Sequence, residues 1–353
     1  AANGNSAVNG CAAGLAEAPD LITFSVNGTI QLTSELLPVQ SAAIRGPGAS
    51  RLVLSGQGTT RVFDLGFSGS VLQGDYTLTG LTIANGNVDF GAGIQALGQH
   101  TVALSEVAMR GNLATSNGGA LYTQESTAVQ LTKSTFTNAT GSSAGRLVSV
   151  INGSLEAENC SFYDSSSLGP LGIVAAGTGK AAFLRAKNLT LSGTDPSGIQ
   201  AHAQSGALVS DARAEYSGTI VQHPLGFAIA AGTGVSFGYN ISSDSTGNLG
   251  ATGDQPNTDA IPPTLCGPVV DQRGFARPFG TNCDIGAVER RPGGDVNGDG
   301  SFNVSDIFYL INFLFAGGPV PVGESDMNGD GVVDVADVFY AINTLFAGGA
   351  API

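Results

Sequence analysis

The chain has 353 residues with 52 Gly, 15 Pro and no Trp, and only 12% of its residues are charged. This composition is too apolar for a disordered protein and too rich in glycine for a helical bundle, so it favours a turn-rich β protein. The net charge of −14, without a basic stripe, argues against nucleic acid and anionic membranes as partners.

The segment 1–20 is small and polar, and it predicts an N-terminal arm or cap. No signal peptide is visible, and the start at Ala1-Ala-Asn3 is what a trimmed, secreted protein would show. No run of 18 or more apolar residues predicts a membrane-spanning helix. We therefore expect a secreted protein associated with the cell surface.

From Asp20 onward, short strands alternate with turns, and one pattern recurs. Its apolar anchors are spaced by 26, 27, 26 and 29 residues: Ile83, Met109, Phe136, Phe162 and Leu191. Apolar and polar residues alternate around each anchor, as in a half-buried strand, and Asn, Gly or Asp follows.

A repeat of this length predicts a solenoid, because one coil cannot bury its apolar row but stacked coils can. We expect an all-β, right-handed parallel β-helix over residues 20–245, within a domain that extends to residue 290. An irregular β-sandwich is the alternative.

The ionisable residues of this domain do not predict a catalytic cluster. Glu106 and Lys133 share a position in the repeat, so they are expected to be neighbours in an ordinary surface ion pair. Glu156 and Glu158 are expected on opposite faces, with no matching charge nearby. The three histidines share no position in the repeat: His100, His202 and His223. We therefore expect no enzyme activity.

The end of the domain reads Asp271-Gln-Arg-Gly274, then Cys283-Asp284-Ile-Gly286-Ala-Val-Glu289. Together with Thr29–Thr33 and Ala43–Gly48, these segments resemble the choice-of-anchor Q family of bacterial extracellular β-helix proteins. The resemblance covers about residues 1–290, and it implies an exported protein but no particular reaction.

The charged residues at this end of the domain have two possible interpretations. Capping of the last coil is the one we expect, since the sheet ends would otherwise be open edges. A catalytic cluster is the alternative. The residues concerned are Asp271, Arg273, Arg277, Asp284 and Glu289.

The four cysteines are expected to play different roles. Cys266 and Cys283 flank a loop, and a disulfide between them would stabilise the end of the domain by roughly 3 kcal/mol. Cys160 occupies an apolar strand position and is expected to be a buried thiol. Cys11 is left over, either free or available to another molecule.

After Arg290 and a linker at residues 291–294, a twelve-residue pattern occurs twice, first from Asp295 and again from Asp326. It has the ligand spacing of a calcium loop, with side-chain oxygens at positions 1, 3, 5 and 12, a main-chain carbonyl at position 7 and glycine at position 6. The expected ligands are Asp295, Asn297, Asp299, Ser301 and Asp306, then Asp326, Asn328, Asp330, Val332 and Asp337. The glycines are Gly300 and Gly331. A chance repeat of Asp/Gly-rich turns is the alternative.

Each loop runs into an amphipathic helix, expected over residues 306–315 and 337–346, and each helix ends at Ala-Gly-Gly. The spacing predicts a buried face on each helix: Ile307, Leu310, Ile311 and Leu314, then Val338, Ala341, Ile342 and Leu345. The duplicated loop–helix unit resembles the dockerin domain over about residues 294–349. The resemblance implies two bound calcium ions and docking onto a cohesin partner.

The aromatic residues of these helices are the expected partner-binding surface: Phe308, Tyr309, Phe313, Phe339 and Tyr340. Two hypotheses of function follow. In the first, the β-helix is a non-catalytic extracellular rod joined by the module at 295–353 to another copy of itself, head to tail in a filament, or to a cohesin-like scaffold. In the second, it is a polysaccharide-active or glycan-binding protein docked into a cellulosome-like complex.

Overall fold

The chain divides into two compact units, one formed by residues 1–278 and 282–288 and the other by residues 279–281 and 289–353. The computed structural model describes residues 19–38, 40–66, 74–125, 127–137, 147–164, 173–177, 182–193, 199–203, 212–217, 219–222, 233–237, 240–242, 249–252, 254, 272, 287, 293–323, 325–330 and 332–352. Several residues named above lie outside these ranges: Cys11, Asp271, Arg273, Arg277, Cys266, Cys283, Asp284, Glu289 and Gly331.

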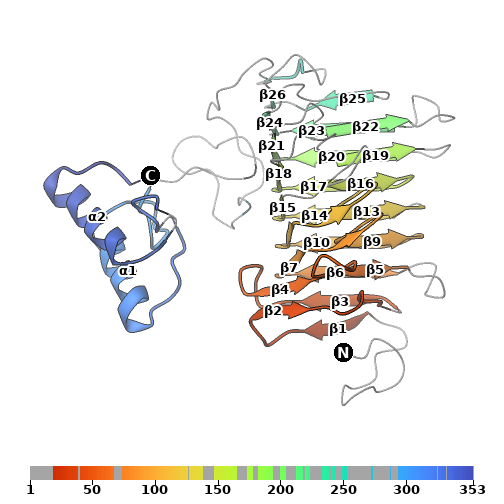
Figure 1. Ribbon diagram of the computed structural model, residues 1–353. Coiled ribbons are helices and arrows are strands. Elements are labelled where there is room, and N and C mark those ends of the chain that lie inside the picture. The colour runs from red at the N-terminus through yellow and green to blue at the C-terminus, as the bar shows by residue number, and fades with distance from the viewer. Residues whose placement is uncertain are drawn as a thin grey trace. The chain divides into compact units, whose positions relative to one another are not determined.

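The first unit is a parallel β-helix, in which strands from successive coils stack into long sheets (Figure 1). Every strand pair in the described residues is parallel, which excludes the β-sandwich, because sandwich sheets are antiparallel. The fold class expected from the repeat is confirmed, and the strands run from Asp20 to Ser242.

Among the described residues, three sheets form the sides of the β-helix. The first contains β1 (Asp20–Thr23), β3 (Ala42–Arg45), β6 (Asp75–Thr79), β10 (Thr101–Ser105), β14 (Ala128–Thr132), β17 (Ser154–Glu158), β20 (Ala182–Lys187), β23 (Ala212–Ser217) and β25 (Thr233–Ser236). The second contains β2 (Gly28–Gln31), β4 (Leu52–Ser55), β7 (Thr82–Ala84), β11 (Ala108–Arg110), β15 (Thr135–Thr137), β18 (Ser161–Asp164), β21 (Thr190–Gly193), β24 (Ile220–Gln222) and β26 (Ile241–Ser242). The third contains β5 (Phe63–Leu65), β9 (Ile94–Leu97), β13 (Leu121–Gln124), β16 (Val148–Ile151), β19 (Ile173–Gly177) and β22 (Ile199–Ala203), and a short pair joins β8 (Asn87–Val88) to β12 (Leu113–Ala114).

The anchors of the sequence repeat form one continuous inward-facing row in the second sheet. Strand pairing aligns all five in register, and each is at most 2% exposed: Ile83, Met109, Phe136, Phe162 and Leu191. The rings of Phe136 and Phe162 stack with centroids 4.7 Å apart. Stacking like residues on like residues buries each coil's apolar row against the next, which is what stabilises a solenoid.

The bend between the first and second sheets depends on left-handed backbone conformations. One repeat position carries positive φ in five successive coils: Gly80 (65°), Glu106 (55°), Lys133 (49°), Asn159 (53°) and Asn188 (49°). Asparagine and glycine adopt this region readily, whereas Glu and Lys do so at a cost. The repeat therefore imposes one backbone shape on every coil, whatever residue occupies the corner.

The outer face of the first sheet overturns the expectation for Glu156 and Glu158. They lie two residues apart on β17, and residues i and i+2 of a strand face the same side. Strand pairing sets Glu156 beside Arg185 and Glu158 beside Lys187, so both carboxylates have a matching charge on the next coil.

Two described residues near the end of the domain, Gln272 and Ala287, contact the outer face of the second sheet. Gln272 Nε2 donates to Ser134 O and Thr135 Oγ1, at 2.9 and 2.8 Å, and Ser161 Oγ donates to Gln272 Oε1 at 2.6 Å. Ala287 N donates to Thr190 Oγ1 at 3.1 Å. These two described residues therefore contact the coils of β15, β18 and β21.

The described residues of the second unit form two helices, α1 (Val304–Ala316) and α2 (Val335–Ala347). Each ends at a glycine in the left-handed conformation, Gly317 with φ 68° and Gly348 with φ 74°, as the Ala-Gly-Gly sequence predicts. Within the described ranges, neither these helices nor any other is long and apolar enough to cross a membrane.

Candidate calcium-binding and docking module

Each helix begins two residues earlier than the apolar pattern indicates, because a side chain caps it. The side-chain oxygens of Asn303 and Asp334 accept hydrogen bonds from the main-chain N–H groups of Ser305 and Ala336, at 2.8 and 2.7 Å. The sequence analysis did not predict these N-caps. Their signal is the spacing Asn/Asp-x-x-Asp, which occurs in both copies of the repeat and forms a capping box.

The small core of the module is built from pairs of equivalent residues. Its fully or nearly fully buried members fall into three pairs, each made of the same position in the two copies: Val296 with Met327, Ile307 with Val338, and Leu310 with Ala341. The helix residues agree with the predicted buried faces, except that Ile342 is 38% exposed. Val296 and Met327, at position 2 of each loop, were not predicted as core residues.

In the first loop, main-chain N–H groups hold the predicted ligand side chains in place. Asp295 Oδ2 accepts from Gly300 N at 3.0 Å, and Asn297 Oδ1 accepts from Asp299 N at 2.7 Å. Asp306, at the last position of the loop, returns to accept from Asn297 N at 3.1 Å. Gly300 has φ 93°, so position 6 makes the turn for which the pattern uses glycine.

The second loop repeats this arrangement. Asp326 Oδ1 accepts from Gly329 N at 2.8 Å, and Asn328 Oδ1 accepts from Asp330 N at 2.8 Å. Asp337 Oδ1 accepts from Met327 N at 2.8 Å and Asn328 N at 3.3 Å. In each loop the structure therefore brings the carboxylate of position 12 to the residues that begin the loop.

The charge balance of these loops fits a bound cation. Asp295, Asp306 and Asp337 have 0% exposure, yet the chain from residue 295 to 353 contains seven Asp, one Glu and no Lys or Arg. A buried carboxylate is costly unless a positive charge or several hydrogen bonds compensate it. Asp306 and Asp337 accept main-chain hydrogen bonds in the first turn of their helices, whose N-termini add only a partial positive charge.

The mixture of ligand types fits calcium better than a transition metal. Neither loop contains His or Cys, and within the described ranges no three side chains drawn from His, Cys, Asp and Glu gather closely enough to hold a metal ion by themselves. The loops combine carboxylates with an Asn amide oxygen and with the main-chain carbonyls of Ser301 and Val332. Calcium accepts this all-oxygen set, and transition metals prefer nitrogen and sulfur ligands.

The expected partner-binding residues fall into two groups. Phe308 and Phe339 are exposed, at 66% and 65%. Phe313, Tyr309 and Tyr340 are partly buried against the core of the module, and the two hydroxyl groups donate to Val320 O and Ala351 O. Two further phenylalanines of the same apolar helix faces are equally exposed: Phe315 at 67% and Phe346 at 69%.

Comparison with known proteins found a match only for the C-terminal module that contains the two loops and helices. A search of curated proteins and a search of solved structures each found no match to the chain. The choice-of-anchor Q resemblance of residues 1–290 is not confirmed and stays a prediction. Residues 293–346, which contain both loops and nearly all of both helices, match the family of the dockerin type I domain.

Proposed function

We propose that this is a non-catalytic extracellular protein whose β-helix is a rod, attached to a partner through the calcium-loaded module at residues 295–353, with residues 291–294 as the linker. One observation carries the proposal. Four phenylalanines lie exposed on the two helices at equivalent positions, Phe308 with Phe339 and Phe315 with Phe346, each about two-thirds exposed.

Exposed aromatic rings are what a docking surface needs. Each helix buries only a narrow stripe against the other, so its large side chains remain in water. Aromatic anchors contribute most of the binding energy of many interfaces. Because the module is an internal duplication, each helix offers the same anchors.

The positive charge of calcium compensates the acidic side chains of the two loops, so that each loop can fold around its ion. The chain's own contribution is to aim the ligand oxygens inward by main-chain hydrogen bonds, and to couple each loop to a helix through Asp306 or Asp337. Docking should therefore depend on calcium. Loops of this ligand type in extracellular modules work at the high calcium concentrations found outside cells, which supports secretion.

The match to the dockerin type I domain favours a cohesin-type partner. The test is surface plasmon resonance of the full chain over a panel of immobilised cohesin modules, with calcium and with EGTA. We expect calcium-dependent binding that the double variant Phe308→Ala/Phe339→Ala weakens at least tenfold. Phe90→Ala, in the β-helix, is the matched control. Absence of binding to every cohesin, or binding unchanged by the double variant, would contradict this partner.

A second copy of the chain is the other partner that the module could bind. Its contact would be head to tail and would not close, so it would produce filaments. Sizing and electron microscopy of the purified protein with calcium and with chelator test this version. Filaments that dissolve on chelation support self-assembly, and a monomer in both conditions excludes it.

A further inference from the structure

Charged side chains gather at one place on the outer face of the first sheet. On three successive strands, β17, β20 and β23, the register aligns Glu156, Arg185 and Glu215 in one column. Arg185 donates to both neighbours, with Nη1 3.1 Å from Glu156 Oε1 and Nη2 3.2 Å from Glu215 Oε2. The next column contains Glu158 and Lys187, whose charged atoms lie 3.4 Å apart.

This cluster is local, although the columns themselves run along the sheet. In the two preceding strands, the positions equivalent to Glu156 carry Gln130 and Ala103, and those equivalent to Glu158 carry Thr132 and Ser105. A ladder that served only to stabilise the sheet would have no reason to begin at β17. Moreover, exposed ion pairs of this kind contribute little to stability.

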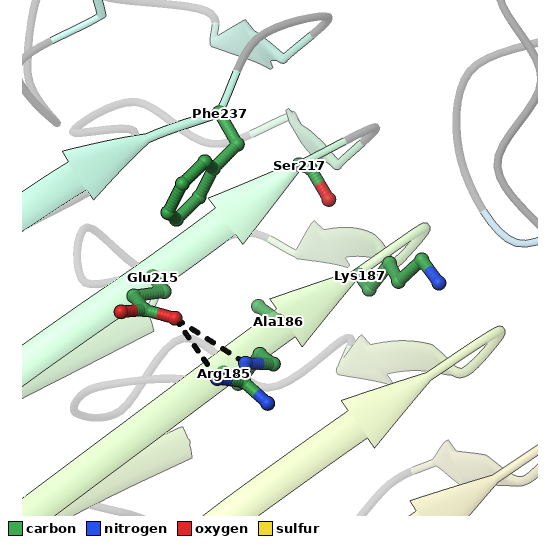
Figure 2. Close-up of a pocket in the computed structure, with 6 residues that line it drawn as sticks. All are labelled: Arg185, Ala186, Lys187, Glu215, Ser217 and Phe237. Atoms are coloured by element: carbon green, nitrogen blue, oxygen red, sulfur yellow. Dashed lines mark hydrogen bonds and ion pairs between the residues drawn. The ribbon is translucent and has the colours of Figure 1, made fainter.

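A surface pocket is lined in part by these charged side chains. It is open to solvent, has a volume of about 260 Å³ and is lined by Arg185, Ala186, Lys187, Glu215, Ser217 and Phe237. Phe237 directly follows β25 and is 60% exposed. Figure 2 shows Glu215 and Arg185 pointing toward each other across neighbouring strands, with the ring of Phe237 at the same end of the pocket. Arg185 is also held by the ring of Phe183, whose centroid lies 5.2 Å from the guanidinium carbon.

We propose that this pocket binds an uncharged glycan. Sugar hydroxyl groups both donate and accept, and the column Glu156–Arg185–Glu215 presents acceptor, donor and acceptor on consecutive coils. Adjacent coils are separated by about 4.8 Å, near the length of one pyranose unit in a chain. The exposed ring of Phe237 supplies an apolar surface for the C–H face of a sugar.

The charge balance argues against an anionic ligand. The two cations, Arg185 and Lys187, are already paired with three carboxylates, so an anion would have to displace a carboxylate and approach the others. The chain as a whole also carries a net charge of −14, which repels polyanions. This binding role goes beyond docking and does not depend on it, since every residue involved belongs to the β-helix.

Affinity electrophoresis of the full chain tests the site. Native gels contain hydroxyethylcellulose, xylan or galactomannan as uncharged polymers, or polygalacturonate as the anionic one. We expect retardation by at least one uncharged polymer, with affinity reduced about tenfold in Phe237→Ala and in Arg185→Ala. The matched controls, Phe90→Ala and Arg110→Ala, remove an exposed ring and an exposed cation from other faces and should bind like the wild type.

Three outcomes would overturn the proposal: no retardation by any uncharged polymer, retardation only by polygalacturonate, or retardation that the four variants leave equal. Circular dichroism of each variant checks that the β-helix is intact. A parallel series with EGTA separates this site from the module, because glycan retardation should persist without calcium even if docking fails.

Discussion

Gln272 donates a hydrogen bond to the main-chain carbonyl of Ser134 at 2.9 Å, although 138 residues separate the two. The same amide group donates to Thr135 Oγ1 and accepts from Ser161 Oγ, so one side chain joins the closing segment to two neighbouring coils. The hydroxyls of Thr135 and Ser161 stand in the same outward column of the second sheet, which is why one amide can reach both.

Gln272→Ala should therefore lower the free energy of unfolding of the β-helix by about 1–3 kcal/mol, because it removes these bonds and leaves their partners unsatisfied. Urea denaturation followed by circular dichroism measures the change. Gln130→Ala, at an exposed position of β14, is the control and should change stability by less than about 0.5 kcal/mol. Equal effects of the two substitutions would show that the closing segment contributes nothing through Gln272.

Removal of calcium should unfold the module and spare the β-helix. The buried carboxylates of Asp295 and Asp306 in the first loop, and of Asp337 in the second, would then lack a compensating cation. Far-UV circular dichroism during EGTA titration should lose its helical component and retain its β component. A helical signal that survives complete chelation would contradict a structural role for calcium.

Asp306→Asn and Asp337→Asn should each weaken calcium binding by roughly tenfold or more, since the number of ligand charges sets the affinity of such loops. Isothermal titration calorimetry of the full chain gives the affinity and the number of sites. Asp75→Asn, which removes an exposed carboxylate from β6, is the matched control. Two sites in the wild type and one weakened site in each variant are the expected result.

Leu310→Ala should destabilise the module by about 3 kcal/mol, because Leu310 has 0% exposure in a core of few residues. Phe308→Ala, on the same helix but 66% exposed, should leave stability within about 0.5 kcal/mol. Thermal unfolding in saturating calcium compares the two. The same cost for both would mean that the helix face is assigned wrongly.

The pKa of Asp64 is raised, mainly by burial, with the charge of Glu35 adding to the effect and Arg61, 3.5 Å away, opposing it. Folding therefore favours protonated Asp64, and its contribution to stability is fully present below the unfolded pKa and is lost as pH rises through the folded one. The difference in unfolding free energy between wild type and Asp64→Asn should fall across that interval. Asp75→Asn, exposed on β6, should show no such fall.

Burial raises the pKa of Cys160 to about 12. Because the thiolate is the reactive species, iodoacetamide at neutral pH should leave Cys160 unmodified in the folded protein and alkylate it in denaturant. Peptide mass mapping distinguishes this residue from the other cysteines. Rapid alkylation of Cys160 without denaturant would show that the coil of β18 opens readily.

The sequence by itself determined the features that recur at a constant spacing. The anchors from Ile83 to Leu191 could be aligned because each coil repeats the same alternation, and stacked coils pair like with like. The loop ligands could be read for a related reason, since a calcium loop takes all its ligands from twelve consecutive residues and needs no distant partner.

Only the tertiary structure decided which residues meet when the spacing is irregular or the partner is far away. Arg185 lies 29 residues after Glu156 and 30 before Glu215, and only the register of β17, β20 and β23 places its guanidinium between them. The contacts of Gln272 likewise depend on how whole elements pack. Local patterns state what each residue prefers, and packing chooses which residues share a surface, because it minimises the free energy of the whole chain rather than of any segment.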